Sequence, residues 1–178
     1  MSKFPQKIHI VGSVGSGKTT LAREMTVQLT VPHYELDNMM WKRSPDGDVR
    51  RSEKLRRQIL QDITSRESWI IEGVHTADWI EESLRQADLI IWLTPAPRVH
   101  NIRIAKRYLR QITGLEKANY TPSFRMFLKM FKWNRYFEKS NKPYIYDAFS
   151  KYGDKVMLVE NKADVEAFIR NLNHTKAS

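Results

Sequence analysis

A glycine-rich turn between an apolar strand and a helix is the feature that most constrains the fold of this chain. Residues 7–12, KIHIVG, form a short apolar run that ends in glycine, which is typical of a buried parallel strand. Residues 18–30 have apolar side chains spaced four apart, as on one face of a helix: Leu21, Met25 and Leu29. Three of only seven glycines in the chain lie at the junction: Gly12, Gly15 and Gly17. The sequence therefore predicts a strand, a tight turn whose backbone can be approached closely, and a helix.

This turn matches the pattern G-x-x-x-x-G-K-[ST] at every fixed position from Gly12 to Thr19. A loop of this kind wraps its backbone N–H groups around phosphate oxygens, and the positive end of the following helix points at the same phosphates. Lys18 is expected to reach the β- and γ-phosphates, and the Thr19 hydroxyl to reach Mg²⁺. The loop predicts binding of a nucleoside triphosphate by Gly12, Ser13, Val14, Gly15, Ser16, Gly17, Lys18, Thr19 and Thr20. It does not identify the molecule that would accept a phosphoryl group.

Strands and helices alternate along the rest of the chain. Apolar runs predict further strands at 33–37, 69–73, 88–94 and 155–160. Apolar periodicity and helix-forming composition predict helices at 52–66, 77–86, 98–112, 123–140 and 163–172, and a Ser-Pro-Asp-Gly sequence predicts a loop over 39–49. Five strands that alternate with helices predict an α/β domain with a parallel sheet, in which ligands bind beyond the carboxyl ends of the strands.

Two acidic residues end predicted strands and are candidates for the site chemistry. Glu72 closes the strand WIIEG, where a charge directly after an apolar run is costly unless it has a partner or a task. It is predicted to hold Mg²⁺, with a helix cap or surface position as the alternative. Asp37 closes HYELD and could orient an acceptor hydroxyl or take its proton, or it could only stabilise the following turn. His75 could contact substrate or be incidental to the site.

The positive charge of the chain is concentrated in one segment. The formal net charge is +10, and residues 98–151 hold 13 of the 30 Lys and Arg residues but only three acidic residues. This segment is expected to face an anionic ligand or partner, or to form a solvated basic surface. Within it, Arg103, Arg107 and Arg110 share one helical face, where guanidinium groups could stabilise a migrating phosphoryl group. Lys106 is expected to point elsewhere, and an exposed stripe without a catalytic task is the alternative.

Residues 123–140 interleave aromatic and basic side chains, and three interpretations remain open. Aromatic rings that stack bases, beside cations that meet phosphates, would suit a nucleic acid. Alternatively, one stripe is the core face of a helix: Phe124, Phe127, Leu128 and Phe131. A second stripe could pack on another subunit: Met126, Met130, Trp133 and Phe137.

Length and composition favour one globular domain. The chain has 178 residues, which is enough for a single domain with a sizeable core. No apolar run approaches the roughly 20 residues needed to span a bilayer, so no membrane association is expected. The absence of cysteine excludes disulfides, and together with the absence of a signal-peptide pattern it favours a cytoplasmic location.

Taken together, these motifs resemble the P-loop nucleoside monophosphate kinases, such as adenylate kinase, along nearly the whole chain. The phosphate loop comes first, and Glu72 stands where that family usually has the aspartate that supports magnesium. RIAKR resembles the start of the mobile lid, with Arg103 and Arg107 on the phosphates. VENKADVEAF resembles the loop and helix around the adenine ring, which places Asn161, Lys162 and Ala163 near the base. The LDxxxW arrangement of Leu36, Asp37 and Trp41, the WIIEG strand with its nearby His75, and IIWL before a proline resemble the bacterial DNA topology modulation (FlaR-type) branch.

The resemblance implies a three-layer P-loop NTPase sandwich with a five-stranded parallel sheet, a helical basic lid, and ATP and Mg²⁺ as cofactors. It implies a core at 7–97 and 152–172, an acceptor-side helix at about 45–66, and a lid at about 98–150. The predicted function is transfer of the ATP γ-phosphate to a small molecule or nucleotide, with an ATP-dependent nucleic-acid regulator as the alternative.

One signature of the family is absent. The sequence Gly-Phe-Pro-Arg does not follow the acid of the third strand; Glu72 and Gly73 are instead followed by Val-His-Thr. An arginine that would grip the phosphate of an acceptor is therefore missing from that place. Its substitutes could be Arg50, Arg51, Arg56 or Arg57.

Overall fold

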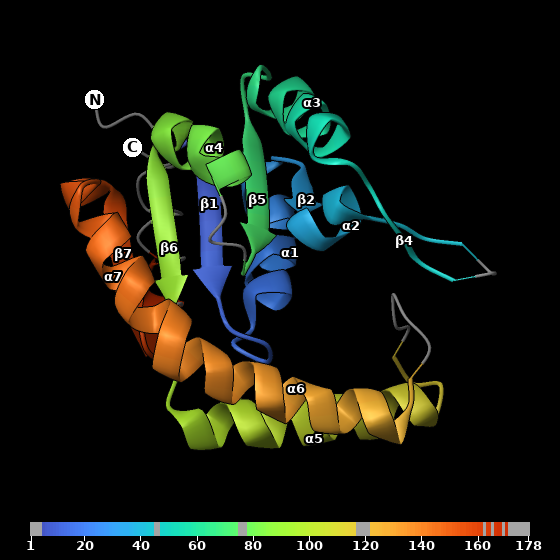
Figure 1. Cartoon of the computed structure of the whole chain (residues 1–178). Coiled ribbons are helices and arrows are strands. Elements are labelled where there is room, and N and C mark those ends of the chain that lie inside the picture. The colour runs from blue at the N-terminus through green and yellow to red at the C-terminus, as the bar shows by residue number, and fades with distance from the viewer. Residues whose placement is uncertain are drawn as a thin grey trace.

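The central element is a five-stranded parallel sheet, as predicted. The computed structural model describes residues 5–44, 47–74, 78–116, 122–161, 163–164, 166–168 and 170. The sheet has the order β2-β5-β1-β6-β7, and every pairing between neighbours is parallel. Its strands are β1 (Lys7–Gly12), β2 (His33–Glu35), β5 (Trp69–Gly73), β6 (Leu89–Leu93) and β7 (Val156–Val159). The phosphate-binding turn thus follows the central strand of the sheet (Figure 1).

Apolar side chains cover both faces of the sheet, which explains why the strands read as continuous hydrophobic runs. On one face, α1 (Lys18–Leu29) buries Leu21 and Met25 against Ile8, Ile10 and Ile91. The other face carries a second cluster under α3 (Glu53–Thr64) and α4 (Glu81–Gln86), which includes Ile71, Trp69 and Trp92. Each large buried side chain contributes about 1.5–3 kcal/mol relative to an exposed one. The result is the predicted three-layer arrangement.

The second predicted strand is shorter than expected. It ends at Glu35, and residues Leu36–Met40 form a short helix, α2. Leu36 is completely buried and packs on Gly73, where an added Cβ would come within 2.6 Å of the leucine side chain. Burial of Leu36 therefore turns the chain into a helix, and Asp37 lies in the first turn of α2 rather than at the end of a strand.

The predicted loop at 39–49 contains a small hairpin. Strands β3 (Trp41–Lys42) and β4 (Val49–Arg50) pair antiparallel, and Arg43 forms an ion pair with Asp48 near the turn. The Ser-Pro-Asp-Gly signal marked the turn correctly, but the two strand segments are too short to show a period in the sequence.

In its described residues, the basic segment forms three α-helices and a short π-helix between the last two. The helices α5 (Pro97–Ile112) and α6 (Phe124–Tyr136), which we call the helical arm, cross below the carboxyl ends of the strands (Figure 1). Tyr108 stacks on Phe127 with ring centroids 4.7 Å apart, which joins the two helices. A five-residue π-helix, Phe137–Asn141, then leads into α7 (Lys142–Ser150). The sequence did not predict α7, which buries Ile145 and Phe149 on the sheet beside Trp92.

The structure agrees at only some positions with the two apolar stripes predicted for residues 123–140, one as a core face and one as a surface for another subunit. Phe124 and Leu128 are exposed, so the expected core face of the helix is wrong at these two positions. Met130 and Phe137 are buried within the chain itself, so they are not a surface for another subunit. The buried residues of this stretch are Met130, Asn134 and Phe137, while Phe127 and Phe131 of the first stripe are partly exposed.

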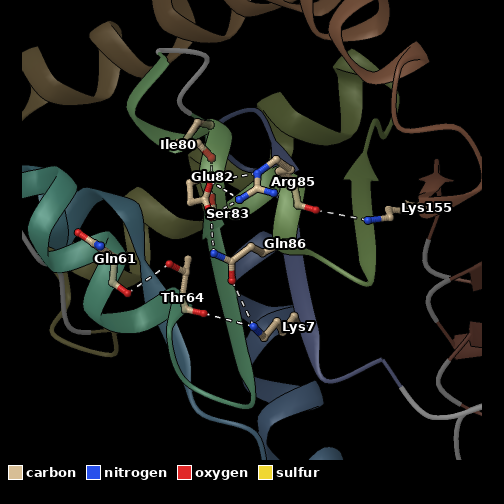
Figure 2. Close-up of polar contacts among 9 residues, drawn as sticks. All are labelled: Lys7, Gln61, Thr64, Ile80, Glu82, Ser83, Arg85, Gln86 and Lys155. Atoms are coloured by element: carbon tan, nitrogen blue, oxygen red, sulfur yellow. Dashed lines mark hydrogen bonds and ion pairs between the residues drawn. The ribbon is translucent and has the colours of Figure 1, made fainter.

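A polar network holds the opposite, amino edge of the sheet (Figure 2). The Lys7 ammonium donates to the Thr64 carbonyl at 3.3 Å and to Gln86 Oε1 at 3.2 Å, which links β1 to the ends of α3 and α4. The Lys155 ammonium donates to the Arg85 carbonyl at 3.3 Å. This edge is therefore closed by structural contacts, while the carboxyl edge carries the loops of the candidate site.

Two further predictions concern the last helix and membrane-spanning segments. The closing helix is present in the described part of 163–172, since residues 163, 164, 166–168 and 170 are helical. Among the residues that the structure describes, no helix combines the length and the apolar character needed to cross a membrane.

Candidate nucleotide and acceptor site

The turn after β1 has the backbone of a phosphate-binding loop. Gly17 has φ 101° and caps α1 without a side-chain hydrogen bond, so the first N–H groups of the helix face the loop uncapped. A side chain at Gly12 would come within 2.6 Å of Ser16 Oγ and 2.9 Å of the Leu93 carbonyl. Both glycines are therefore required by the shape of the turn, and the uncapped helix end provides donors for an anion.

Lys18 is the first residue of α1, and its side chain reaches back to the loop. Its ammonium donates to the Ser13 carbonyl at 3.0 Å. Burial lowers the pKa of Lys18 from its ordinary value, and the nearby charges of Glu72 and Asp37 act in the opposite sense. A multiply charged anion would stabilise the charged form of this buried ammonium, because its attraction offsets the cost of desolvation.

Glu72 lies beside the phosphate loop, as the sequence predicted. The parallel register pairs Ile10 of β1 with Glu72 of β5, and the Thr19 hydroxyl donates to Glu72 Oε1 at 2.6 Å. Glu72 is only 5% exposed. A hydroxyl and a buried carboxylate at the start of a helix are oxygen ligands of the type that Mg²⁺ prefers, and they would hold the ion together with phosphate oxygens. Within the described residues, no group of three or more His, Asp or Glu side chains could bind a metal by itself.

A cavity of about 620 Å³ runs along the carboxyl edge of the sheet. The structure places most of the predicted site residues on its walls: Val14, Gly15, Ser16, Gly17, Lys18, Thr19, Thr20, Asp37, Glu72, Arg103, Arg107 and Asn161. Gly12 and Ser13 shape the loop behind the wall, and Ala163 is not among the lining residues. Lys162 and His75 lie outside the described residues.

The basic residues of α5 form the wall of the cavity that faces the phosphate loop. Arg103 Nη1 donates to the Ser16 carbonyl at 2.6 Å, so its guanidinium touches the loop itself. Arg107 Nε lies 3.8 Å from Glu116 Oε1. Arg110 and Lys106 also line the cavity, so the expectation that Lys106 points elsewhere is wrong. Four cations within about two turns of one helix thus line the wall of the cavity that faces the phosphate loop.

His100 is a site residue that the sequence did not reveal. Its ring is 1% exposed, with Nε2 2.7 Å from the Pro95 carbonyl and Nδ1 2.5 Å from Ser13 Oγ. Because a carbonyl can only accept, Nε2 carries a proton and donates to Pro95. His100 lies one turn before Arg103 on the same helix, and that i, i+3 spacing is the signal that could have identified it.

Glu35 is the second residue that sequence reasoning missed. It lines the cavity and pairs in register with Glu72 of the neighbouring strand. Burial raises the pKa of Glu35 from its ordinary value, and the charge of Glu72 raises it further. Glu35 stands two residues before Asp37. The pattern Glu-Leu-Asp at the end of an apolar stretch could therefore have predicted a pair of carboxylates.

The arginines proposed to replace the missing acceptor-binding arginine do not line the cavity. Arg51 donates to the carbonyls of Asn38 and Trp41, at 2.5 and 2.7 Å, and so holds the end of α2. Arg57 pairs with Glu53, and Arg56 is buried with its guanidinium 5.4 Å from the ring centre of Trp79. Arg50 is exposed on the hairpin. Two described arginines line that side of the cavity: Arg43, which is paired with Asp48, and Arg23 of α1, whose charge acts on Glu35.

Comparison with known proteins relates the chain to others by sequence and by fold. No family model matches it. It is 29% identical over 102 residues to the uncharacterized protein YqaC of Bacillus subtilis (strain 168), and the match covers 55% of each protein. The chain thus aligns with about half the length of that curated relative.

Solved structures with the same fold cover nearly all of the chain. A shikimate kinase from Bacteroides thetaiotaomicron has a TM-score of 0.54 at 19% identity and covers 96% of this chain and 98% of its own. A shikimate kinase from Acinetobacter baumannii in complex with shikimate has a TM-score of 0.58 at 16% identity, with 96% and 92% covered. A gluconokinase from Sinorhizobium meliloti 1021 has a TM-score of 0.54 at 14% identity, with 96% and 90% covered. At these identities the likeness concerns the fold, and the chain has the fold of P-loop kinases.

Proposed function

We propose that this chain is a phosphotransferase that moves the γ-phosphate of ATP to a hydroxyl group of a small molecule or nucleotide. One observation carries the proposal. A single cavity joins a phosphate loop, a row of cations on α5 and a set of carboxylates at the end of β2. The likeness of the fold to shikimate kinases and a gluconokinase supports a kinase with a small-molecule acceptor.

The donor half of the site would bind MgATP. The phosphates would lie on the backbone N–H groups of residues 13–19, with Lys18 on the β- and γ-phosphates. Thr19 and Glu72 would hold Mg²⁺, which neutralises phosphate charge when it is bound. Asn161 lines the cavity near the end of β7, so the adenine ring would lie at that side of the sheet. The adenine contacts of Lys162 and Ala163 stay predictions.

The acceptor half would lie beside β2 and α2. Asp37 lines the cavity in the first turn of α2, and its charge acts on Lys18. In the proposed step, the acceptor oxygen bonds to the γ-phosphorus while the bond from that phosphorus to the β–γ bridging oxygen breaks. The hydroxyl proton passes to Asp37, and ADP leaves with the bridging oxygen. Arg103 and Arg107 would stabilise the negative charge on the migrating group.

Phosphoryl transfer by a Lys18→Ala variant tests this function. The exposed Lys54 on α3 supplies the control, Lys54→Ala, which removes the same charge from a residue that does not line the cavity. We expect Lys18→Ala to lower the rate of transfer by about 10²–10³ and to weaken MgATP binding, because the buried ammonium acts directly on the phosphates. Equal activity of the two variants would contradict the proposed function.

Nucleic-acid binding is a second candidate function, favoured by the outer face of α6. Trp133 and Tyr136 are exposed there, next to the exposed side chains of Arg125, Lys129 and Lys132. Such a surface could stack bases and contact phosphates. Affinity for single-stranded DNA, measured at several salt concentrations, should fall steeply with salt if the backbone is bound. Weak binding that is insensitive to salt would remove this candidate. The FlaR-type resemblance likewise stays a prediction.

A further inference from the structure

The helical arm carries an exposed apolar patch. On α5, three large apolar side chains at i, i+7 and i+10 share one side of the helix, and each is more than half exposed: Ile102, Leu109 and Ile112. On α6, Phe124 and Leu128 lie four apart and are also more than half exposed. Tyr108, one turn before Ile112, stacks on Phe127, and the Phe127 ring lies 5.9 Å from that of Phe124. The five exposed side chains therefore form one surface across both helices, which we call the arm patch.

The opposite side of α5 is occupied by the phosphate loop and the cavity. His100 and Ile104 are buried there, and Ile104 lies 3.1 Å from the position of a Cβ on Gly15. The cations of α5 line the cavity: Arg103, Lys106, Arg107 and Arg110. In Figure 1, α5 lies at the lower end of the molecule, with α6 and the sheet above it in the view. A partner on the arm patch would therefore leave the cavity uncovered.

The charges of the arm indicate what kind of partner fits the patch. Large contiguous apolar patches on a protein surface mark interaction sites. The helix α5 contains five Lys or Arg residues and α6 contains four, and neither contains Asp or Glu. The partner must therefore offer apolar surface and negative charge together.

Two other occupants of the arm patch match only one of these properties. A second copy of the chain offers apolar surface, but it would bring the same unbalanced cations against each other. A nucleic acid offers negative charge, but its phosphates and grooves have little apolar surface for a row of aliphatic side chains. The surface of an anionic lipid bilayer has both properties, because charged headgroups lie directly above the acyl chains.

The border of the arm patch also has the composition of a membrane interface. Trp133 and Tyr136 of α6 are exposed, and so are three neighbouring cations: Arg125, Lys129 and Lys132. Trp and Tyr are favoured where apolar and polar layers of a bilayer meet, and long basic side chains reach headgroups while their stems stay on apolar surface.

We propose that the arm patch docks on the surface of an anionic lipid bilayer, with α5 and α6 lying in the plane of the interface. A helix that lies on a bilayer does not need the length of a spanning segment. The inference therefore differs from the sequence-based expectation of no membrane association. It goes beyond the proposed phosphotransferase function and does not depend on it, because the arm patch and the cavity lie on different sides of α5.

Sedimentation with lipid vesicles tests the proposed surface. The probes are vesicles of phosphatidylcholine alone and vesicles that also contain anionic phosphatidylglycerol. We expect the full chain to sediment with the anionic vesicles at least about tenfold more strongly, because its cations attract the headgroups before the apolar side chains insert. Absence of binding to the anionic vesicles would overturn the inference.

Matched variants separate the arm patch from exposed apolar residues in general. Leu109→Gln removes an apolar side chain from the patch, and Val27→Gln removes one that is exposed on α1. Gln is a good helix former, so both variants should keep their helices. We expect Leu109→Gln to lower the affinity for anionic vesicles by about fivefold to tenfold, and Val27→Gln by less than about twofold. Equal losses in the two variants would contradict docking through the patch.

A second pair of variants tests the role of charge. Lys132→Gln removes a cation beside the arm patch, and Lys54→Gln removes one that is exposed on α3. We expect Lys132→Gln to lower the affinity for anionic vesicles by about fivefold, the effect of one charge near an anionic surface, and Lys54→Gln to leave it unchanged. If neither variant changed the affinity, attraction to the headgroups would not hold the arm, and the inference would fail.

The absence of cysteine from the chain allows a direct measurement of contact. Leu109→Cys and Val27→Cys would each carry one environment-sensitive fluorophore. Anionic vesicles should shift the emission of the probe at position 109 to the blue and leave that at position 27 unchanged, since an inserted probe loses contact with water. The opposite result would overturn the inference. So would a dimer, seen by sedimentation equilibrium, that Leu109→Gln dissociates, because a second copy would then cover the arm patch.

Discussion

At the scale of single residues, His100 joins the phosphate loop to the helix that carries the arginines. Its two ring nitrogens contact the Pro95 carbonyl and Ser13 Oγ. Each such hydrogen bond contributes about 0.5–1.5 kcal/mol, so we predict that His100→Ala weakens MgATP binding by about tenfold. A double-mutant cycle with Ser13→Ala, measured by calorimetry, should give a combined effect smaller than the sum. Additive effects would show that the two side chains act independently.

Glu35 provides a residue-scale prediction about pH. Because burial and Glu72 raise its pKa in the folded protein, the native state holds this proton more tightly than the unfolded state does. The stability from this group is therefore complete below the ordinary Glu value of 4.5 and is lost as pH rises through the higher folded value. Near neutral pH, Glu35→Gln should raise the melting temperature of the ligand-free protein by about 1–3 °C, a small gain because Glu35 is only half-buried. Below pH 4.5 this gain in melting temperature should vanish. A gain that is constant with pH would contradict this explanation.

At the scale of elements, the short helix α2 depends on Arg51. The Arg51 guanidinium donates to the carbonyls of Asn38, Met39 and Trp41, at and just after the end of the helix, where carbonyls lack intrahelical partners. Arg51→Ala should lower the free energy of unfolding by about 1–3 kcal/mol, whereas Arg50→Ala, on the exposed side of the hairpin, should lower it by less than about 0.5 kcal/mol. Urea denaturation gives both values. Equal effects of the two variants would show that the carbonyl contacts do not stabilise α2.

At the scale of the whole molecule, the sequence predicted the sheet and the position of Glu72 beside the glycine-rich turn, because both depend on local patterns. The glycine turn, the buried strands and the acid after β5 all lie within short continuous segments. The acceptor half depends on packing between distant segments. Leu36 turns the chain into α2 because Gly73 leaves space for it, and His100 reaches Ser13 across 87 positions in the sequence. The helix α7 was missed because its buried residues, Ile145 and Phe149, are too few to show a period.

The same long-range packing predicts that the basic segment folds with the sheet as one unit. Phe149 of α7 is buried with its ring centroid 5.6 Å from that of Trp92 in β6, whereas the neighbouring Tyr146 is 71% exposed. We predict that Phe149→Ala lowers the free energy of unfolding by about 3–5 kcal/mol, and Tyr146→Ala by less than about 1 kcal/mol. Calorimetry and circular dichroism should show one transition in both variants, because α7 covers a face of the central sheet. If Phe149→Ala instead released the basic segment in a separate transition, residues 98–150 would be an independent lid, and the arginines of α5 would not be held against the phosphate loop by the core.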